Sequence, residues 1–330
     1  MDHAHNPSRR RAAVALALLA AGLPPAVHAQ ERWPSRPIRL VVPFPPGGSS
    51  DVAARLLAPR LGERLGQQVV VENRPGAGGT LALGQVAKAA PDGYTLVLAA
   101  AGGLTISPNL NPNLGYDPLA DFAPITGFAR IPFVLVANAD LPVARADELV
   151  RLARSQPGRL TFASGGNGTA MHLGGELFKS MSQTFIVHIP YRGSAPAITA
   201  VMAGETQLAV SDITSVLGKT EGGRMKVIGV MSKDRTDLAP GVPTLDETGL
   251  KGFDVSGWFA IMAPARTPQP IVARLNSEIT SLIRSDEFRE RFKALGMEPI
   301  PTTPDELAQM TRAELARWAT VIQRAGVKAE

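Results

Sequence analysis

Three short loops of the sequence are rich in glycine and hydroxyl side chains, and each lies between an apolar run and a helical pattern. They are residues 44–51 (Phe-Pro-Pro-Gly-Gly-Ser-Ser-Asp), 164–169 (Ser-Gly-Gly-Asn-Gly-Thr) and 191–196 (Tyr-Arg-Gly-Ser-Ala-Pro). The start of a helix presents backbone N–H groups and a partial positive charge, and glycine lets a ligand approach them closely. In parallel sheets such loops lie at the carboxyl ends of strands, where ligands bind. Together the three loops predict a site that holds an anion such as a carboxylate between two lobes.

The sequence lacks the signatures of common catalytic and metal sites. It contains no cysteine, which excludes disulfides, thiol nucleophiles and Cys-zinc sites. It has no Gly-x-Ser-x-Gly motif and no His-Glu-x-x-His motif. Residues 76–81 resemble the Gly-x-Gly-x-x-Gly motif of dinucleotide-binding proteins, but the last position is Leu81 instead of glycine. We interpret His172 and His188 as hydrogen-bonded packing residues, with a catalytic base or metal ligand as the alternative. The sequence therefore predicts a protein that is not an enzyme and that binds no metal or cofactor.

Residues 1–29 have the pattern of a secretory signal. Three arginines at 9–11 precede an apolar run at 12–23, and a small-residue cleavage pattern ends just before Gln30. The run is shorter than the ~20 residues that span a bilayer, and no later segment is long and apolar enough. We therefore expect a soluble, exported protein that begins near Gln30.

Charge argues against a nucleic acid partner. The signal carries three arginines and one aspartate, so its removal lowers the formal net charge from +5 to +3. The remaining basic and acidic side chains are mixed along the chain, whereas a nucleic-acid-binding protein concentrates its basic residues.

Apolar runs alternate with helical patterns from residue 37 onward, which predicts an α/β fold with parallel strands. Strands are expected at residues 38–42, 69–71, 94–98, 160–163, 185–189, 207–210, 226–231 and 255–264. Helices are expected at residues 49–65, 146–155, 169–180, 195–203, 270–295 and 304–325, with one more ending near residue 90. About ten strands suit two sheets better than one.

Seven segments, in order along the chain, resemble the Bug family of periplasmic solute receptors that serve tripartite tricarboxylate transporters. They are residues 33–38 (Trp-Pro-Ser-Arg-Pro-Ile), 42–51, 71–79, 91–96, 190–193 (Pro-Tyr-Arg-Gly), 242–245 and 257–259 (Gly-Trp-Phe). The resemblance implies a type II periplasmic-binding-protein fold, in which two Rossmann-like α/β lobes are joined by two crossing strands with a ligand cleft between them. It implies lobe 1 from residues 30–131 and 256–330, and lobe 2 from residues 132–255.

The resemblance also implies which residues face the ligand. In the first lobe they are Phe44, Gly47, Gly48 and Ser49, which hold one ligand carboxylate, with Ala100 and Ala101 at the end of the third strand. In the second lobe they are Gly168, Thr169, Tyr191 and Gly193, with Asp212 at a position that can tune selectivity. Relatives often carry small hydroxyl residues where this chain has the two alanines, so we expect a more apolar pocket here. We interpret Trp258 as packing near the hinge rather than stacking on ligand.

The resemblance implies a receptor that binds a small carboxylated solute and delivers it to membrane transport subunits. The solute classes left open are di- or tricarboxylates, amino acids and aromatic acids, and we expect a monomer. One alternative is a periplasmic sensor that presents the closed form to a signalling protein. The other is a hydrolase that uses the same cleft, which the missing nucleophile–base pair disfavours.

Overall fold

The computed structural model describes residues 33–111 and 113–325, and the predicted signal sequence and cleavage site lie outside them. Residues from Arg36 onward form one compact unit. Its strands are β1 (Ile38–Val42), β2 (Val69–Asn73), β3 (Thr95–Ala100), β4 (Phe122–Asn138), β5 (Thr161–Ser164), β6 (Val187–Pro190), β7 (Leu208–Asp212), β8 (Met225–Val230), β9 (Ser256–Pro264) and β10 (Glu298–Pro299). Its helices are α2 (Ser49–Leu65), η1 (Ala77–Gly79), α3 (Thr80–Ala87), η2 (Gly102–Ile106), α4 (Ser107–Leu110), α5 (Ala146–Ser155), α6 (Ala170–Ser182), α7 (Ser194–Ala203), α8 (Ile213–Val216), α9 (Gln269–Ile283), α10 (Asp286–Ala294) and α11 (Pro304–Ala325).

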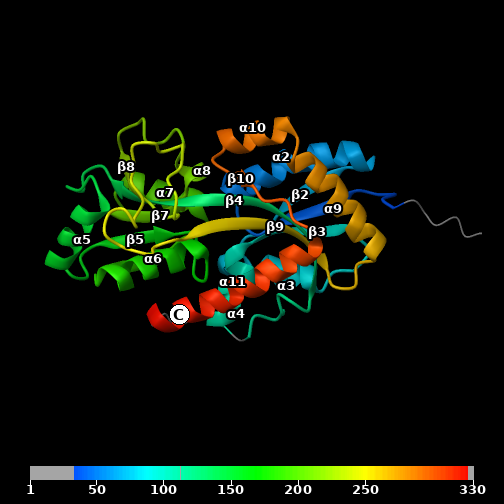
Figure 1. The fold of residues 1–330 in the computed structure, drawn as a ribbon, viewed down its shortest axis with the longest axis horizontal. Coiled ribbons are helices and arrows are strands. Elements are labelled where there is room, and N and C mark those ends of the chain that lie inside the picture. The colour runs from blue at the N-terminus through cyan, green and yellow to red at the C-terminus, as the bar shows by residue number, and fades with distance from the viewer. Residues whose placement is uncertain (1–32, 112, 326–330) are drawn as a thin grey trace, which may run out of the picture. The chain divides into compact units, whose positions relative to one another are not determined.

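Strand β4, which has 17 residues, connects the two halves of the sheet. The hydrogen-bonded strand order is β2-β1-β3-β9-β4-β7-β5-β6, and β8 and β10 also pair with β4. Up to Pro132, β4 pairs antiparallel with β9, and from Phe133 it pairs with β7 and then also with β8. Figure 1 shows β4 and β9 running side by side between the two groups of helices. The two sheets expected from the sequence are joined into one continuous sheet, because β4 is long enough to pair in both halves.

Each half of the sheet has a parallel core of the kind that strand–helix alternation predicts. Strand β1 pairs in parallel with β2 and β3, and β5 pairs in parallel with β6 and β7. The helices α2, α6 and α7 follow β1, β5 and β6 directly along the chain. Their N-termini therefore lie at the carboxyl ends of the parallel strands, where ligands bind in such sheets.

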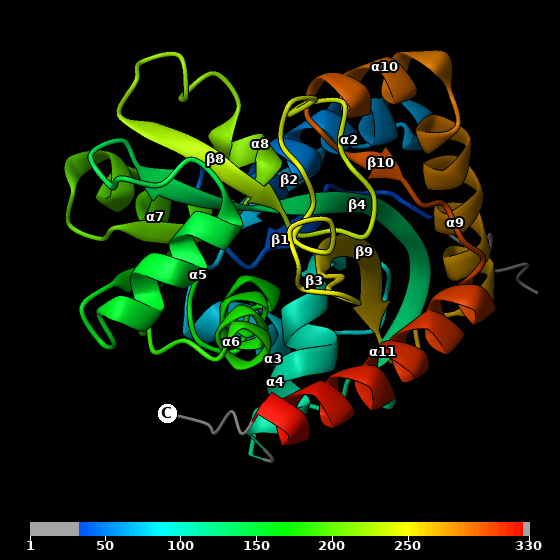
Figure 2. The ribbon, with the colours of Figure 1, turned by 60° about the vertical axis from the view of Figure 1, so that its left-hand side comes forward.

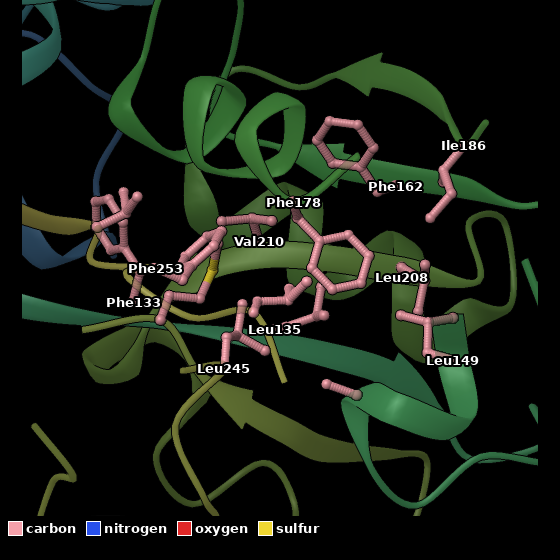
Figure 3. Close-up of a cluster of buried hydrophobic side chains, with 14 of the residues drawn as sticks. Phe133, Leu135, Leu149, Phe162, Phe178, Ile186, Leu208, Val210, Leu245 and Phe253 are labelled. Atoms are coloured by element: carbon pink, nitrogen blue, oxygen red, sulfur yellow. The ribbon is translucent and has the colours of Figure 1, made fainter. Parts of the chain in front are cut away.

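Two clusters of buried apolar side chains stabilise the two halves. One contains Val97, Met262 and Leu307, and the other contains Phe162 and Trp318. Figure 3 shows part of the second cluster, where aromatic and aliphatic side chains from β4, β5, β7 and α6 pack together. Helix α11 supplies Leu307 to the first cluster and Trp318 and Ile322 to the second, and it contacts β4, η2, α4 and α6 along its length (Figure 2). This helix therefore stabilises both halves of the sheet.

The helix expected at residues 270–295 is two helices in the structure. Helix α9 ends at Ile283, and α10 begins after Ser285, whose side-chain oxygen accepts a hydrogen bond from the Phe288 N–H group. Acidic residues Asp286 and Glu287 occupy the first turn of α10, where they interact favourably with the helix dipole. This capping pattern ends one helix and starts the next.

Candidate functional site

Three helix N-termini line one cavity, which we call the inner chamber. Helix α2 begins after Gly48, α6 after Thr169 and α7 after Gly193. The chamber is lined by residues 44–46, 48–50, 78, 100–102, 131, 133, 165, 169–171, 192–196 and 257–259. The volume of the inner chamber that the centre of a water-sized sphere can occupy is about 50 Å³. This volume is enough for roughly four water molecules. The first N–H groups of each helix have no acceptor within the helix. The His172 N–H group of α6 donates to the Thr169 hydroxyl, whereas N–H groups without such a side-chain cap are available to an anion in the chamber.

A second cavity, which we call the outer chamber, adjoins the first. Its lining residues are 44, 75–79, 165–167 and 190–192, and its volume measured in the same way is about 230 Å³. Phe44, Gly78, Gly165 and Arg192 line both chambers. These four residues therefore form the boundary between the two cavities.

The electrostatic character of the inner chamber comes from backbone dipoles rather than from side-chain charges. Among the described residues that line it, Arg192 alone carries a charge. Ser49, Ser50 and Ser194 bring buried hydroxyl groups to it, and Ser194 Oγ accepts a hydrogen bond of 3.0 Å from Ser215 Oγ. The chamber therefore offers many neutral donors and a partial positive charge from three helices.

The first loop is held in shape by Asp51. Its carboxylate accepts hydrogen bonds from the Gly47 N–H group at 3.0 Å, from Arg55 Nε at 3.0 Å and from Asn73 Nδ2 at 3.0 Å. Asn73 Nδ2 also donates to the Phe44 carbonyl at 2.9 Å. Burial alone would raise the pKa of Asp51, but these hydrogen bonds together lower it below its usual value. Asp51 and Asn73 therefore brace the loop from behind.

The second loop is held by two histidines that stack on each other. The His172 and His188 rings lie 4.1 Å apart at an angle of 14°. The Gly168 N–H group donates to His172 Nδ1 at 3.2 Å, and Ser164 Oγ shares a hydrogen bond of 2.7 Å with His188 Nε2. The two imidazoles thus fix both ends of the loop between β5 and α6, as hydrogen-bonded packing residues.

Both histidines are neutral near pH 7. Burial and, to a lesser extent, the charge of nearby Lys179 together lower the pKa of His172 to about 4. Burial, His172 and Lys179 together lower the pKa of His188 to about 3. A neutral His172 can accept at Nδ1 while it carries its proton on Nε2, which lies 4.0 Å from Glu176 Oε1. Within the described residues, no group of three or more His, Cys, Asp or Glu side chains is placed to hold a metal ion.

The structure brings seven of the eleven predicted site residues to the inner chamber. They are Phe44, Gly48, Ser49, Ala100, Ala101, Thr169 and Gly193. Tyr191 lines the outer chamber, and its hydroxyl donates to Glu205 at 3.3 Å. Gly47 and Gly168 line neither chamber but have positive φ angles of 88° and 72°. They shape their loops and direct their N–H groups to Asp51 and His172.

Asp212 lies outside both chambers. It is completely buried at the end of β7, where its Oδ1 accepts a hydrogen bond of 2.8 Å from the Ser215 N–H group and caps α8. Ser215 in turn donates to Ser194, which lines the inner chamber. Asp212 therefore reaches the chamber through Ser215 and Ser194, and its influence on selectivity stays a prediction.

Several lining residues were missed in the sequence. Ile131 and Phe133 come from β4, and Met171 comes from the first turn of α6. Trp258 also lines the inner chamber, and its buried side chain belongs to the same apolar cluster as Leu307. The apolar run from Phe133 to Ala137 was a signal for β4, but Pro132 beside it is typical of a strand edge or a loop.

Comparison with known proteins identifies relatives over nearly the whole chain. Residues 53–327 match the family described as tripartite tricarboxylate transporter family receptor (TctC). The chain is 38% identical to protein BugT of Bordetella pertussis over 98% of its own length and 99% of that protein. No described helix is long and apolar enough to cross a membrane.

Two solved structures share the fold. Rpa4515 of R. palustris, solved with adipate, is 35% identical with a TM-score of 0.87, over 90% of this chain and 99% of that one. MatC (Rpa3494) of Rhodopseudomonas palustris, solved with bound malate, is 33% identical with a TM-score of 0.83, over 88% of this chain and 100% of that one. The fold is therefore the two-lobed fold of periplasmic binding proteins, as predicted. The chain belongs to the tripartite tricarboxylate transporter receptor family of periplasmic solute receptors, which confirms the resemblance to the Bug proteins.

Proposed function

We propose that this protein is a monomeric, non-enzymatic receptor that binds a small carboxylated solute in the inner chamber and delivers it to the membrane subunits of a tripartite transporter. One observation carries the proposal. The N-termini of α2, α6 and α7 meet at a chamber whose described lining residues include no acidic side chain. A carboxylate there accepts hydrogen bonds from helix N–H groups and serine hydroxyls without repulsion from another anion.

The bracing of the loops supports this binding mode. A hydrogen bond to a charged group contributes about 1.5–3 kcal/mol when the donors are already in place. Asp51 and the pair His172–His188 hold two of the loops by side chains that lie behind them. The donors are therefore positioned before the solute arrives, so binding does not have to order them. The adipate and malate in the two related structures support a carboxylate as the ligand.

The residues that the structure describes include no activated nucleophile at either chamber, which supports a receptor rather than a hydrolase. The hydrogen bond between Ser164 and His188 has the atoms of a nucleophile–base pair. However, Ser164 is fully buried and lines neither chamber, and a histidine with a pKa of about 3 is a poor base near pH 7.

We also propose the lobe boundary predicted from the sequence, at residues 131–132 and 255–256, because β4 changes partners between Pro132 and Phe133.

The proposal is tested by identifying the natural ligand. Mature protein is purified from the periplasm under native conditions, and the ligand released on denaturation is identified by mass spectrometry. We expect a small carboxylated compound that binds again to the emptied protein in calorimetry, with no chemical change during incubation. Conversion of the compound to a product would favour the hydrolase, and a ligand without a carboxylate would overturn the proposed binding mode.

A further inference from the structure

A small contact joins the two halves of the sheet at a place outside both chambers. Thr214 Oγ1, in α8, donates a hydrogen bond of 2.6 Å to the Leu295 carbonyl oxygen. Helix α8 follows β7, which pairs with the second half of β4, whereas Leu295 precedes β10, which pairs with the first half at Ala129 and Arg130. The hydrogen bond therefore connects the two halves, and neither of its residues lines a chamber.

Close packing at Gly296 accompanies this hydrogen bond. Gly296 is buried, and a Cβ atom there would lie 2.6 Å from Ile213 Cγ2 and 2.4 Å from Leu238 Cδ1. Both neighbours belong to the second half, and the β-branched side chain of Ile213 is stiff. Because residue 296 has no side chain, the first half can approach α8 this closely.

Helix α8 is held in place by contacts within the second half. Asp212 Oδ1 accepts a hydrogen bond of 2.8 Å from the Ser215 N–H group, and Ser215 Oγ donates to Ser194 Oγ at 3.0 Å. Ser194 lines the inner chamber at the start of α7. These three residues all belong to the second half, so the Thr214 hydroxyl stays in position when the halves separate. The contact can therefore form again without reordering of α8.

The halves are held more firmly on the other side of β4 and β9. Figures 1 and 2 show α8 and α10 on one side of these strands, and α6 and α11 on the other. Helix α11 places Trp318, which is 2% exposed, and Ile322 in the apolar cluster of the second half. Burial of large apolar side chains stabilises a contact more than one hydrogen bond of a half-buried hydroxyl does. The contact at α8 is therefore the place where the halves separate most easily.

We propose, building on the proposed function, that Ile213, Thr214, Leu295 and Gly296 form a latch that holds the solute-bound arrangement of this receptor. The latch closes when the two halves come together around the solute, and it opens before the solute leaves. A solute that binds only the latched arrangement gains affinity in proportion to the population of that arrangement. Thr214 is thus a positioning residue, which raises affinity without contact with the solute.

Spin labels on the two halves measure the latch directly, without solute. The chain contains no cysteine, so Ala203→Cys on α7 and Glu290→Cys on α10, both exposed, give one label on each half. Double electron–electron resonance then measures the ratio of short-distance to long-distance populations. We expect Thr214→Val, which removes the hydroxyl and keeps the shape, to lower this ratio by about threefold to tenfold. Thr214→Ser, which keeps the hydroxyl, should stay within about twofold of the wild-type protein.

Calorimetry with hexanedioate as the probe measures the consequence for affinity. Where the free protein is mainly open, Thr214→Val should weaken hexanedioate binding by the same factor of about threefold to tenfold. Where the free protein is mainly latched, the change appears in the distances instead. Thr280→Val is the matched control, because the Thr280 hydroxyl is also half-buried and donates at 2.7 Å to the Asn276 carbonyl oxygen, but within α9. It should leave the affinity and the ratio of populations within about twofold.

Gly296→Ala tests the packing of the latch. The added methyl group meets Ile213 and Leu238, so we expect the ratio of populations to fall by more than about tenfold. Gly66→Ala is its control, because Gly66 follows α2 with a φ of 71°, against 72° at Gly296, and a Cβ there would meet no atom within 4 Å. This control introduces the same backbone strain and should leave the distances unchanged.

Unchanged distances and affinity on Thr214→Val would overturn the latch and leave the receptor function intact. Equal shifts for Gly296→Ala and Gly66→Ala, or equal losses for Thr280→Val and Thr214→Val, would do the same. If the wild-type protein binds no carboxylate while the distances of Thr214→Val and Gly296→Ala still shift, the proposed function fails and the contact between the halves stands.

Discussion

The side chain of His172 stacks on that of His188 and at the same time accepts a hydrogen bond from the Gly168 N–H group. One imidazole therefore connects a strand of the sheet to a loop beside the inner chamber. The contact requires that both rings stay neutral, because two adjacent cations would repel each other and a protonated Nδ1 cannot accept.

This pair makes the protein sensitive to acid. The folded pKa values, about 4 for His172 and about 3 for His188, lie below the usual 6.5, so the unfolded chain binds protons more readily. The histidine contribution to stability is complete above pH 6.5 and decreases as the pH falls from 6.5 towards 4 and 3. For His172 the shift corresponds to about 3 kcal/mol. We expect the melting temperature to decrease progressively between pH 6.5 and 4.

The variant His172→Gln isolates this effect from the titration of carboxylates. It should be less stable than the wild-type protein at pH 7, and the difference between their free energies of unfolding should narrow at pH 4.5. Chemical denaturation at pH 7, 5.5 and 4.5 measures the free energies of unfolding of the wild-type protein and of His172→Gln. Stability curves that stay parallel across this range would show that His172 does not titrate as described.

A larger side chain at Gly48, the residue before α2, should hinder solute binding. A Cβ on Gly48 would lie 3.7 Å from Ser194 Oγ, which is ordinary contact, but the γ-methyl groups of valine would add bulk where the solute approaches the backbone. We expect Gly48→Val to weaken carboxylate binding by about tenfold to a thousandfold, which corresponds to one or two lost charged hydrogen bonds. The loss should exceed that of Arg192→Ala, as measured by calorimetry.

Gly48→Ala serves as the control at the same position, and it should change affinity by less than about threefold. If folded Gly48→Val keeps its affinity while Arg192→Ala abolishes binding of mono- and dicarboxylates alike, the site is an ion-pair clamp. In that case the helix N-termini do not hold the solute.

The brace behind the first loop should contribute to stability. Asp51→Ala leaves the Gly47 N–H group and one of the two N–H donors of the Asn73 amide without an acceptor, so we expect the free energy of unfolding to decrease by about 2–3 kcal/mol. Arg55→Ala removes an exposed partner of the same carboxylate and should cost about 0.5–1 kcal/mol. Urea denaturation compares the two variants, and equal effects would indicate that the Asp51–Arg55 ion pair, rather than the bracing of the loop, dominates.

Cleavage of the signal during export would determine the first residue of the mature protein. From the signal pattern at residues 1–29 we expect the periplasmic form to begin near Gln30. N-terminal sequencing of protein released from the periplasm measures this. Retention of residues before Val27 in the exported product would contradict a cleaved signal.

The elements that local patterns specify were predicted well, and those that depend on tertiary pairing were not. Strand β1 and helix α2 follow from an apolar run, a glycine-rich turn and the stop at Gly66, which has a positive φ of 71°. Strand β4 was missed because prolines interrupt its pattern, and its role depends on partners far along the chain.

The same distinction applies to the site. The loops that line the inner chamber carried local signals in their glycines and hydroxyl residues. The stacking of His172 on His188 has no sequence signal, since it depends on how α6 packs against β5 and β6. Asp212 was placed near the ligand from the resemblance, but the start of α8 uses its side chain as a cap.

The position of β9 between β3 and β4 has a consequence for how the chain is made. The first half of the sheet is assembled from residues at both ends of the sequence, because β3 (Thr95–Ala100) obtains its antiparallel neighbour only from Ser256–Pro264. Until β9 has been synthesised, β3 lacks this neighbour and has an open strand edge. Pairings this distant in sequence also slow folding. We therefore expect the chain to fold late relative to its synthesis, which would favour the export that the signal pattern at residues 1–29 predicts.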